Sequence, residues 1–286
     1  MEVNIDSSAG FCFGVLQTIK KAESSIKKTT NKNIYVLGEI IHNPHEIKRL
    51  NDIGLKTISV DELDNLKQSN SIVIIRAHGE PPPTYKTLDE LELKYFDATC
   101  PLVKKLQNKI IAYYKNDFQI IIFGKADHPE VVGLRGVCDD KCIVSLDVND
   151  LMNKIDLKKE TVLISQTTMS SVQFLFMYDT LLLHFKDKKM LHIENTICKF
   201  MVSREKKLKK FATENELIIF VAGRNSSNGK VLYNVCKDAN ENTIFIEDIN
   251  KLNRIILENY NNIGITGATS TPMWYLETIK EKIMGG

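Results

Sequence analysis

Three cysteines, Cys12, Cys100 and Cys198, are the residues of this chain best suited to chemistry. Each precedes a stretch with helical spacing of apolar residues, and an apolar strand that stops at a glycine follows 24 to 26 residues after each cysteine. A helix N-terminus favours the thiolate form of sulfur, which is the metal ligand. Three such thiols predict a metal site with one open position, holding either zinc or a cubane iron–sulfur cluster. The alternative is that all three pack in the interior where repeats meet.

The other cysteines fit a structural role better. Cys138 and Cys236 each lie 38 residues after a cysteine of the first group, and the matching position of the first copy is Leu50. A position that accepts leucine is a core position, and a buried cysteine behaves there as a small hydrophobe. Cys142 has no counterpart in the other copies, so a metal site shared with Cys138 is the weaker interpretation.

Polar residues follow the strands and predict an anion site. His42 and His128 each come four residues after the glycine of their strand, and His78 follows another strand. Hydroxyl and amide groups occupy comparable places: Thr167, Thr168, Ser226, Ser227, Asn228 and Ser270. Together with helix N-termini, such donors bind a phosphate-like anion without many lysines.

Glu130, two residues after His128, is the candidate acid–base residue. We expect it to face Thr167, and a carboxyl group in a desolvated site can hold a proton at neutral pH and deliver it. The alternative is an exposed glutamate at a helix start.

The elements that must position these residues form a threefold repeat. Helical and apolar strand patterns alternate along all 286 residues, which predicts parallel α/β sheets. We expect three pseudo-repeated α/β domains around a central site, with boundaries 14–97, 98–194 and 195–286 together with 1–13. Ligands of parallel sheets bind beyond the carboxyl ends of the strands, where the polar residues follow.

Composition indicates an ordinary enzyme. The net charge of +2, from 38 basic and 36 acidic residues, argues against a strong preference for nucleic acid or an acidic membrane. The N-terminus lacks the pattern of a signal peptide, and no apolar run has the length of a membrane span. We therefore expect a cytoplasmic protein, whose cysteines stay reduced.

Taken together, these motifs resemble the 4-hydroxy-3-methylbut-2-enyl diphosphate reductase (LytB) family over the whole chain, in family order. The segments that carry the resemblance are Gly10-Phe11-Cys12, Ile41-His42-Asn43-Pro44, Arg76-Ala77-His78-Gly79, Asp97-Ala98-Thr99-Cys100-Pro101, His128-Pro129-Glu130-Val131, Gln166-Thr167-Thr168, Thr196-Ile197-Cys198 and Asn225-Ser226-Ser227-Asn228.

The resemblance implies three α/β domains around a [4Fe-4S] cluster held by Cys12, Cys100 and Cys198. It implies reductive removal of the allylic hydroxyl of 4-hydroxy-3-methylbut-2-enyl diphosphate, the last step of the non-mevalonate isoprenoid route, giving isopentenyl and dimethylallyl diphosphates. The open iron would act as a Lewis acid on that hydroxyl. Glu130 would supply protons, assisted by Thr167. The diphosphate would be held by His42, His78, His128, Ser226, Ser227, Asn228 and Ser270.

The resemblance also implies an electron donor such as flavodoxin or ferredoxin. The last loop departs from the family pattern, so that Thr269 and Ser270 are alternative phosphate contacts. Two other classes stay open on the residues alone: an iron–sulfur or zinc protein that relays electrons or acts as a scaffold, and a zinc hydrolase of a phosphorylated substrate.

Overall fold

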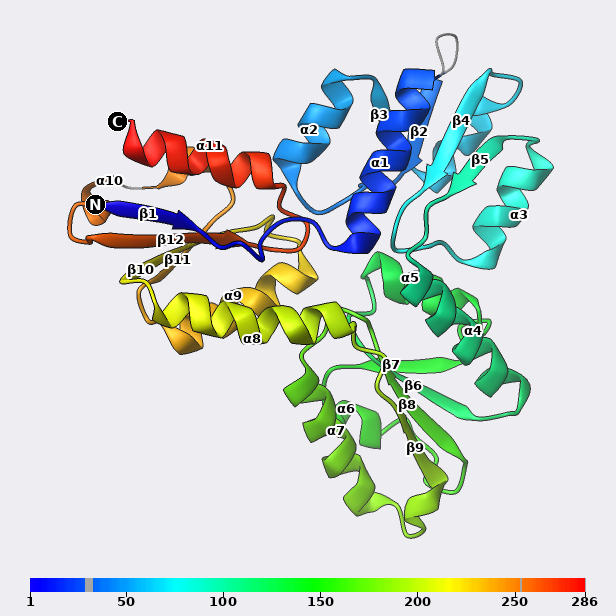
Figure 1. The fold of residues 1–286 in the computed structure, drawn as a ribbon. Helices are drawn as coiled ribbons and strands as arrows, with labels where there is room; N and C mark the ends of the chain where they lie inside the picture. The colour runs from blue at the N-terminus through cyan, green and yellow to red at the C-terminus, as the bar shows by residue number, and fades with distance from the viewer. Residues whose placement is uncertain (29–32, 253, 286) are drawn as a thin grey trace. The chain divides into compact units, whose positions relative to one another are not determined.

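The computed structural model describes residues 1–28, 33–252 and 254–285, and Figure 1 shows its elements in chain order. The described strands form three parallel four-stranded sheets with helices between the strands. The predicted α/β class with repeated parallel sheets is therefore confirmed, while the predicted domain boundaries stay a prediction. The chain divides into two compact units.

The first unit comprises residues 1–27, 39–55 and 199–286. Its sheet has the order β1-β12-β10-β11, with β1 Glu2–Ile5, β10 Leu217–Val221, β11 Thr243–Ile246 and β12 Asn262–Gly267. Its helices are α1 Phe13–Lys28, α2 Pro44–Asp52, α8 Lys199–Thr213, α9 Ser227–Ala239, α10 Arg254–Leu257 and α11 Met273–Met284, with the 3-10 turn η3 Ile249–Lys251. Helix α11 covers one face of the sheet, and α8 and α9 lie on the other (Figure 1).

The second unit comprises residues 28–38 and 56–198 and holds two sheets. One has the order β3-β2-β4-β5, with β2 Asn33–Leu37, β3 Leu55–Ile58, β4 Ser71–Ile75 and β5 Lys94–Asp97. The other has the order β7-β6-β8-β9, with β6 Gln119–Phe123, β7 Cys142–Ser145, β8 Thr161–Ser165 and β9 Leu191–Glu194. The helices are α3 Pro82–Glu90, α4 Pro101–Lys115, α5 Pro129–Gly136, α6 Val148–Met152 and α7 Ser171–His184, with η1 Val60–Leu66 and η2 Lys188–Met190.

The sequences of the central strands explain their burial. Strands β6 and β8 are rich in β-branched residues and buried along almost their whole length, because helices cover both faces of a parallel sheet. Their side chains join those of α4 and α5 in one core cluster that includes Leu106, Ile122, Val131 and Ile164. A proline opens α2, α4 and α5, where its missing N–H and fixed φ suit the first helical turn.

Strand order is the same in all three sheets when strands are compared by their place in the repeat. The glycine-terminated strands β2, β6 and β10 lie inside the sheet, and their inner neighbours are β4, β8 and β12. The outer strands β5, β9 and β1 are those that come before Cys100, Cys198 and Cys12 in the chain. Each cysteine therefore immediately precedes a helix, in the connection that follows an outer strand. Among the helices of the described residues, none combines the length and the apolar character that crossing a bilayer requires.

Candidate functional site

The three cysteines predicted to bind a metal share one main-chain anchor. In each copy the cysteine N–H donates a hydrogen bond to the carbonyl oxygen of the residue two positions beyond the end of the neighbouring strand. These bonds join Cys12 to Thr269 (3.2 Å), Cys100 to Ala77 (2.9 Å) and Cys198 to Thr167 (2.9 Å). All three side chains are intermediate in exposure, and none is in a disulfide among the described residues. The repeat thus gives each cysteine the same backbone hydrogen bond.

Glu130 is a buried acid with two partners from one residue. Its side chain is 1% exposed at the start of α5. The carboxylate accepts the N–H of Thr167 at 2.7 Å and the hydroxyl of Thr167 at 2.8 Å. Burial raises the pKa of Glu130 to about 7, although both hydrogen bonds from Thr167 act to lower it. The alternative of an exposed glutamate is therefore wrong, and the carboxyl group is poised to exchange a proton near neutral pH.

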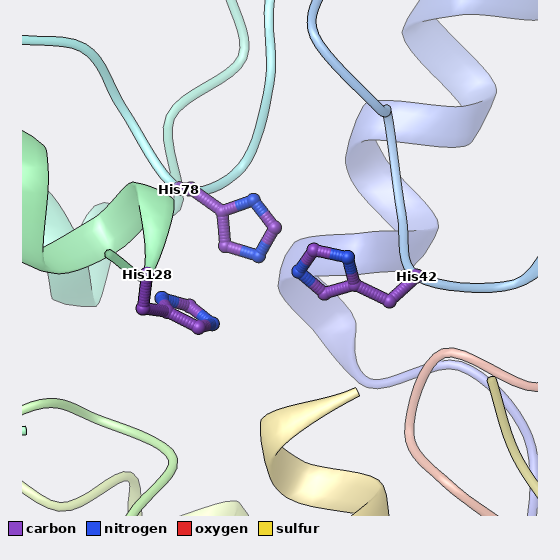
Figure 2. A group of neighbouring side chains, drawn as sticks. All are labelled: His42, His78 and His128. Carbon is purple, nitrogen blue, oxygen red and sulfur yellow. The ribbon is translucent and has the colours of Figure 1, made fainter. Parts of the chain in front are cut away.

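His128 is the N-cap of the same helix, and its capping bond fixes its tautomer. The ring Nδ1 accepts the N–H of Glu130 at 3.2 Å, so in the neutral ring the proton lies on Nε2. His128 and His78, which follows β4, pack edge to face with ring centroids 5.3 Å apart (Figure 2). Two imidazole rings and an α-helix N-terminus thus lie together in the second unit.

The pKa of Cys100 depends on two opposing effects, the helix N-terminus and burial. The N–H groups of Leu102 and Val103 do lower its pKa, as expected at a helix start. Burial outweighs them, and the nearby negative charges of Cys198 and Glu130 add to it, so the net pKa of Cys100 is raised. The amides at the helix start thus favour the thiolate as predicted, but burial has the larger effect on the pKa of this residue. Its charge interactions also show that Cys100, Cys198 and Glu130 are neighbours in the second unit.

The first unit carries the polar residues of the third copy. Ser226 caps α9 by accepting the N–H of Gly229 at 3.1 Å, and its hydroxyl lies 3.4 Å from that of Ser270. Asn228 accepts the N–H of Thr269 through Oδ1 at 2.8 Å. Ser227 follows on the first turn of α9 and is 3% exposed. The start of this helix thus gathers hydroxyl and amide groups suited to an anion.

Glu130 and Asn228 occupy equivalent positions of the repeat. Each is two residues after an N-cap, and each accepts the N–H of the residue two positions past the neighbouring strand. That residue, Thr167 or Thr269, also accepts the N–H of a cysteine. The same scaffold therefore carries a titrating carboxyl group in one copy and a non-titrating amide in another.

His42 lies in the first unit, where its main-chain carbonyl group contacts the repeat copy that contains α9. The N-cap of α2 is Asn43, which accepts the N–H of Glu46 at 3.1 Å, so His42 precedes the cap. Its Nδ1 is 3.2 Å from a carboxylate oxygen of Glu39, and its carbonyl group abuts Gly223. Equal spacing from a glycine therefore does not make His42 and His128 structurally equivalent; Figure 2 labels both rings.

Gln166 is a supporting residue that the sequence alone did not identify as functional. It is fully buried, its Oε1 accepts the N–H of Lys125 at 3.2 Å, and its Nε2 donates to the Thr168 hydroxyl at 2.9 Å. It thereby joins the loops after β6 and β8. The pattern that could have indicated its role is a glutamine directly between the end of a strand and two threonines.

Two of the remaining cysteines lie in the cores, and Cys142 is intermediate in exposure. Cys138, Cys236 and the repeat-matched Leu50 are all 0% exposed, so the predicted core position is confirmed. Cys138 donates to the carbonyl oxygens of Leu134 and Arg135, and Cys142 packs against its cluster. Burial raises the pKa of Cys236 to about 12.

Comparison with known proteins covers nearly the whole chain. The family model described as LytB protein matches residues 3–284. The 4-hydroxy-3-methylbut-2-enyl diphosphate reductase of Chloroherpeton thalassium is 42% identical over 307 residues, covering 99% of this chain and 96% of the relative. The protein of that name from Bacteroides fragilis is 40% identical over 287 residues, covering 99% and 97%.

Two solved structures are also similar. One is (E)-4-hydroxy-3-methyl-but-2-enyl diphosphate reductase, described as the terminal enzyme of the non-mevalonate pathway, with a TM-score of 0.73, 34% identity and full coverage of both chains. The other is the E-1-hydroxy-2-methyl-but-2-enyl-4-diphosphate reductase of Plasmodium falciparum, with a TM-score of 0.87 and 28% identity over 98% of this chain and 87% of that one. By sequence and by fold, this chain belongs to the LytB protein family.

Proposed function

We propose that the chain is a 4-hydroxy-3-methylbut-2-enyl diphosphate reductase, acting in the last step of the non-mevalonate isoprenoid route. The reaction replaces the allylic C–OH bond with C–H, consumes two electrons and two protons, and releases water. It yields isopentenyl and dimethylallyl diphosphates. The observation that carries the proposal is the buried Glu130–Thr167 pair beside Cys100, because this reaction needs a proton donor next to a redox centre.

A [4Fe-4S] cluster held by Cys12, Cys100 and Cys198 fits the thiols of the chain. These three are partly exposed, start helices and share one backbone anchor, whereas Cys138 and Cys236 are fully buried. When bound, the cluster would supply electrons and one open iron that acts as a Lewis acid on the substrate oxygen.

Glu130 is proposed to hold the proton that the reaction consumes. Its pKa of about 7 leaves both the acid and the base form accessible at neutral pH. Thr167 is bonded to both carboxylate oxygens through its N–H and hydroxyl, which fixes the direction of the carboxyl group. The Thr167 hydroxyl can also relay this proton: its hydrogen rotates toward the substrate, and its oxygen then accepts a proton from the protonated Glu130.

Diphosphate binding is proposed to use neutral donors. His128 offers Nε2–H because its Nδ1 is occupied, and Asn228 offers Nδ2 because its Oδ1 is occupied. The Ser270 hydroxyl lies 3.4 Å from that of Ser226 at the start of α9, and it is the proposed phosphate contact of the last loop. The remaining proposed contacts are His42, His78, Thr168 and Ser227.

The electron donor is proposed to be a small redox protein such as flavodoxin or ferredoxin, and the cytoplasm is the proposed location. Both proposals follow from the family resemblance and from the six reduced cysteines.

The test is an anaerobic assay of reconstituted protein with reduced methyl viologen and 4-hydroxy-3-methylbut-2-enyl diphosphate. Substrate-dependent oxidation with formation of both five-carbon diphosphates is the expected result. Brown, cluster-loaded protein without oxidation would favour an electron relay and contradict the proposal. Colourless protein that takes up zinc but no iron would favour a zinc hydrolase instead.

A further inference from the structure

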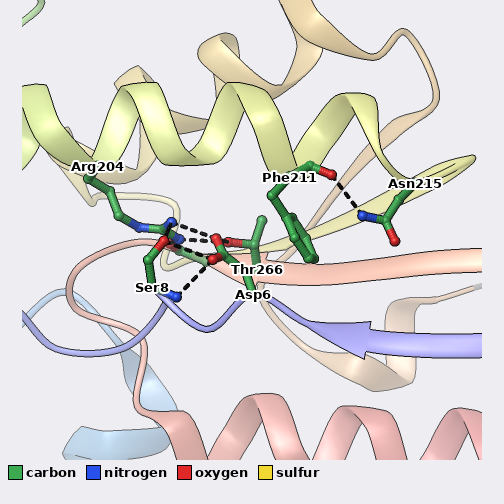
Figure 3. A network of polar contacts seen from close by, with 7 residues as sticks. Asp6, Ser8, Arg204, Phe211, Asn215 and Thr266 are labelled. Carbon is green, nitrogen blue, oxygen red and sulfur yellow. Dashed lines mark hydrogen bonds and ion pairs between the residues drawn. The ribbon is translucent and has the colours of Figure 1, made fainter.

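A closed polar network lies buried near the segment that carries Cys12. Arg204 of α8 is 2% exposed and Asp6, directly after β1, is 3% exposed. One guanidinium nitrogen donates to Asp6 Oδ2 and to the Ser8 hydroxyl, and the other donates to the Thr266 hydroxyl at 2.7 Å. Thr266 in turn donates to Asp6 Oδ2 at 2.9 Å, and Ser8 donates to Asp6 Oδ1 at 2.8 Å (Figure 3).

The network holds both segments that determine the position of Cys12, residues 6–9 before it and the end of β12. Asp6 donates its N–H to Ile265 of β12 and accepts the N–H of Ala9, so residues 6–9 are turned and held against that strand. Thr266 and Gly267, which both accept from Arg204, lie on β12 just before Thr269, the residue whose carbonyl oxygen accepts the Cys12 N–H. Arg204 therefore connects the segment before Cys12 to the strand that leads to its hydrogen-bond partner.

Stability alone does not account for an ion pair at this place. A buried pair loses its hydration, and apolar residues of similar volume are often equally stable or more stable. What apolar side chains lack is direction: here two charges and two hydroxyls specify the angle and register of one loop. Burial acts to raise the pKa of Asp6, but the charge of Arg204 and the bonds from Ser8 hold it below its usual value, so the carboxylate is ionised at neutral pH.

We propose that Asp6 and Arg204 are positioning residues for Cys12, holding its thiol in the orientation that cluster binding requires. The proposal rests on the proposed role of Cys12 as a cluster ligand. Loss of the network would leave the fold intact but allow residues 6–12 to sample other conformations.

Three variants separate positioning from stability. Arg204→Gln breaks the pair and leaves Asp6 buried without its charge partner, which lowers the urea midpoint. The double variant Asp6→Leu with Arg204→Met removes both charges, and we expect it to recover much of that midpoint. Arg49→Gln is the matched control, because Arg49 forms ion pairs in the same unit with Glu46 and Glu23 instead.

The first readout is the rate of iodoacetamide labelling of Cys12 in metal-free protein, resolved by peptide mass analysis. We expect about tenfold faster labelling of Cys12 in both network variants, with Cys100 and the Arg49→Gln protein within about twofold of wild type. A wild-type Cys12 rate in the folded double variant, or equal acceleration by Arg49→Gln, would overturn the proposal.

The second readout is iron and sulfide per chain after anaerobic reconstitution, with the EPR spectrum of the reduced protein. Less than half of the wild-type iron in both network variants is the expected result. Wild-type protein that takes up no iron would count against the proposed function, whereas the labelling rates would still test the positioning role. Full iron content with an unchanged spectrum in the network variants would contradict the positioning role of Asp6 and Arg204 but leave the proposed function standing.

Discussion

At the scale of single residues, Glu130 is unusual because its carboxyl group is buried and its described hydrogen bonds come from a neutral residue. Its two recorded partners both belong to Thr167, and both stabilise the charged form. Burial prevails, and the native pKa of about 7 exceeds the ordinary value of 4.5. The native state therefore binds a proton that the unfolded chain has already released over this range.

This difference predicts a pH-dependent stability that Glu130→Gln removes. For metal-free wild-type protein, the contribution of Glu130 is full below pH 4.5 and is lost as the pH rises through about 7. The loss corresponds to at most about 3 kcal/mol. Urea unfolding at pH 5, 6, 7 and 8 measures it, and Glu130→Gln should be relatively more stable at pH 8. Identical slopes in the two proteins would mean that Glu130 is ionised in the native state.

Thr167→Val should shift the pH dependence of turnover. The hydroxyl bond lowers the pKa of Glu130, so removing it raises that pKa and moves the alkaline decline of kcat to higher pH. Thr167→Ser keeps the hydroxyl and serves as the control. Steady-state assays of iron-matched proteins decide the question. A decline that stays in place would exclude Glu130 as the titrating group.

Residue types predicted the thiols, Glu130 and the anion-binding histidines as candidates, because each sits beside a strand end or a helix start. What the sequence could not predict is which of two opposing effects prevails. The pKa of Cys100 is raised by burial and lowered by the helix amides, and the extent of burial is a property of the packed fold. The pairing of Asp6 with Arg204 likewise joins residues 198 positions apart, with no local pattern to reveal it.

At the scale of elements, the glycine after each inner strand lets another segment approach closely. At Gly223 a Cβ atom would collide with the main-chain carbonyl of His42. At Gly124, the equivalent position, a Cβ would meet the side chains of Gln166 and Val131 at 3.0 Å. A backbone carbonyl group cannot move aside as a side chain can, so Gly223 should tolerate an added methyl group less well than Gly124.

Gly223→Ala should therefore be more harmful than Gly124→Ala. We expect Gly223→Ala to lower the free energy of unfolding by about 2–4 kcal/mol and to raise KM, because His42 and the start of α9 must separate. Gly124→Ala should cost about 1–2 kcal/mol. Urea unfolding and steady-state kinetics measure both effects. Equal stability of the two variants would contradict the close contact at His42.

Element patterns predicted the strand ends well, since β2, β6 and β10 each stop one or two residues before the expected glycine. They failed at the helix starts. The helix after the glycine is capped by Asn43 in one copy, His128 in the next and Ser226 in the third. Counting from the glycine therefore misaligned His42 with His128, because the loop length between strand and cap varies among copies.

At the scale of the whole molecule, the repeat separates two classes of cysteine. Cys12→Ser, Cys100→Ser and Cys198→Ser should each reduce iron content to below about a tenth of wild type, since a thiolate ligand is lost. Cys138→Ala and Cys236→Ala should keep the cluster while costing about 1 kcal/mol of stability, because each leaves only a small cavity. Iron and sulfide assays with urea unfolding test all five. A normal cluster in any serine variant would remove that cysteine from the ligand set.

The backbone anchor of each cysteine has an evolutionary consequence. Because only an N–H and a carbonyl oxygen take part, any amino acid with those groups can occupy the anchoring position, and alanine and two threonines do so here. In a threefold repeat, a substitution at that position can therefore change the side chain without removing the bond that holds the cysteine. At Thr167 the main-chain carbonyl oxygen holds Cys198 while the side-chain hydroxyl bonds Glu130, so a substitution there can alter the surroundings of the carboxyl group and still keep the anchor of the cysteine.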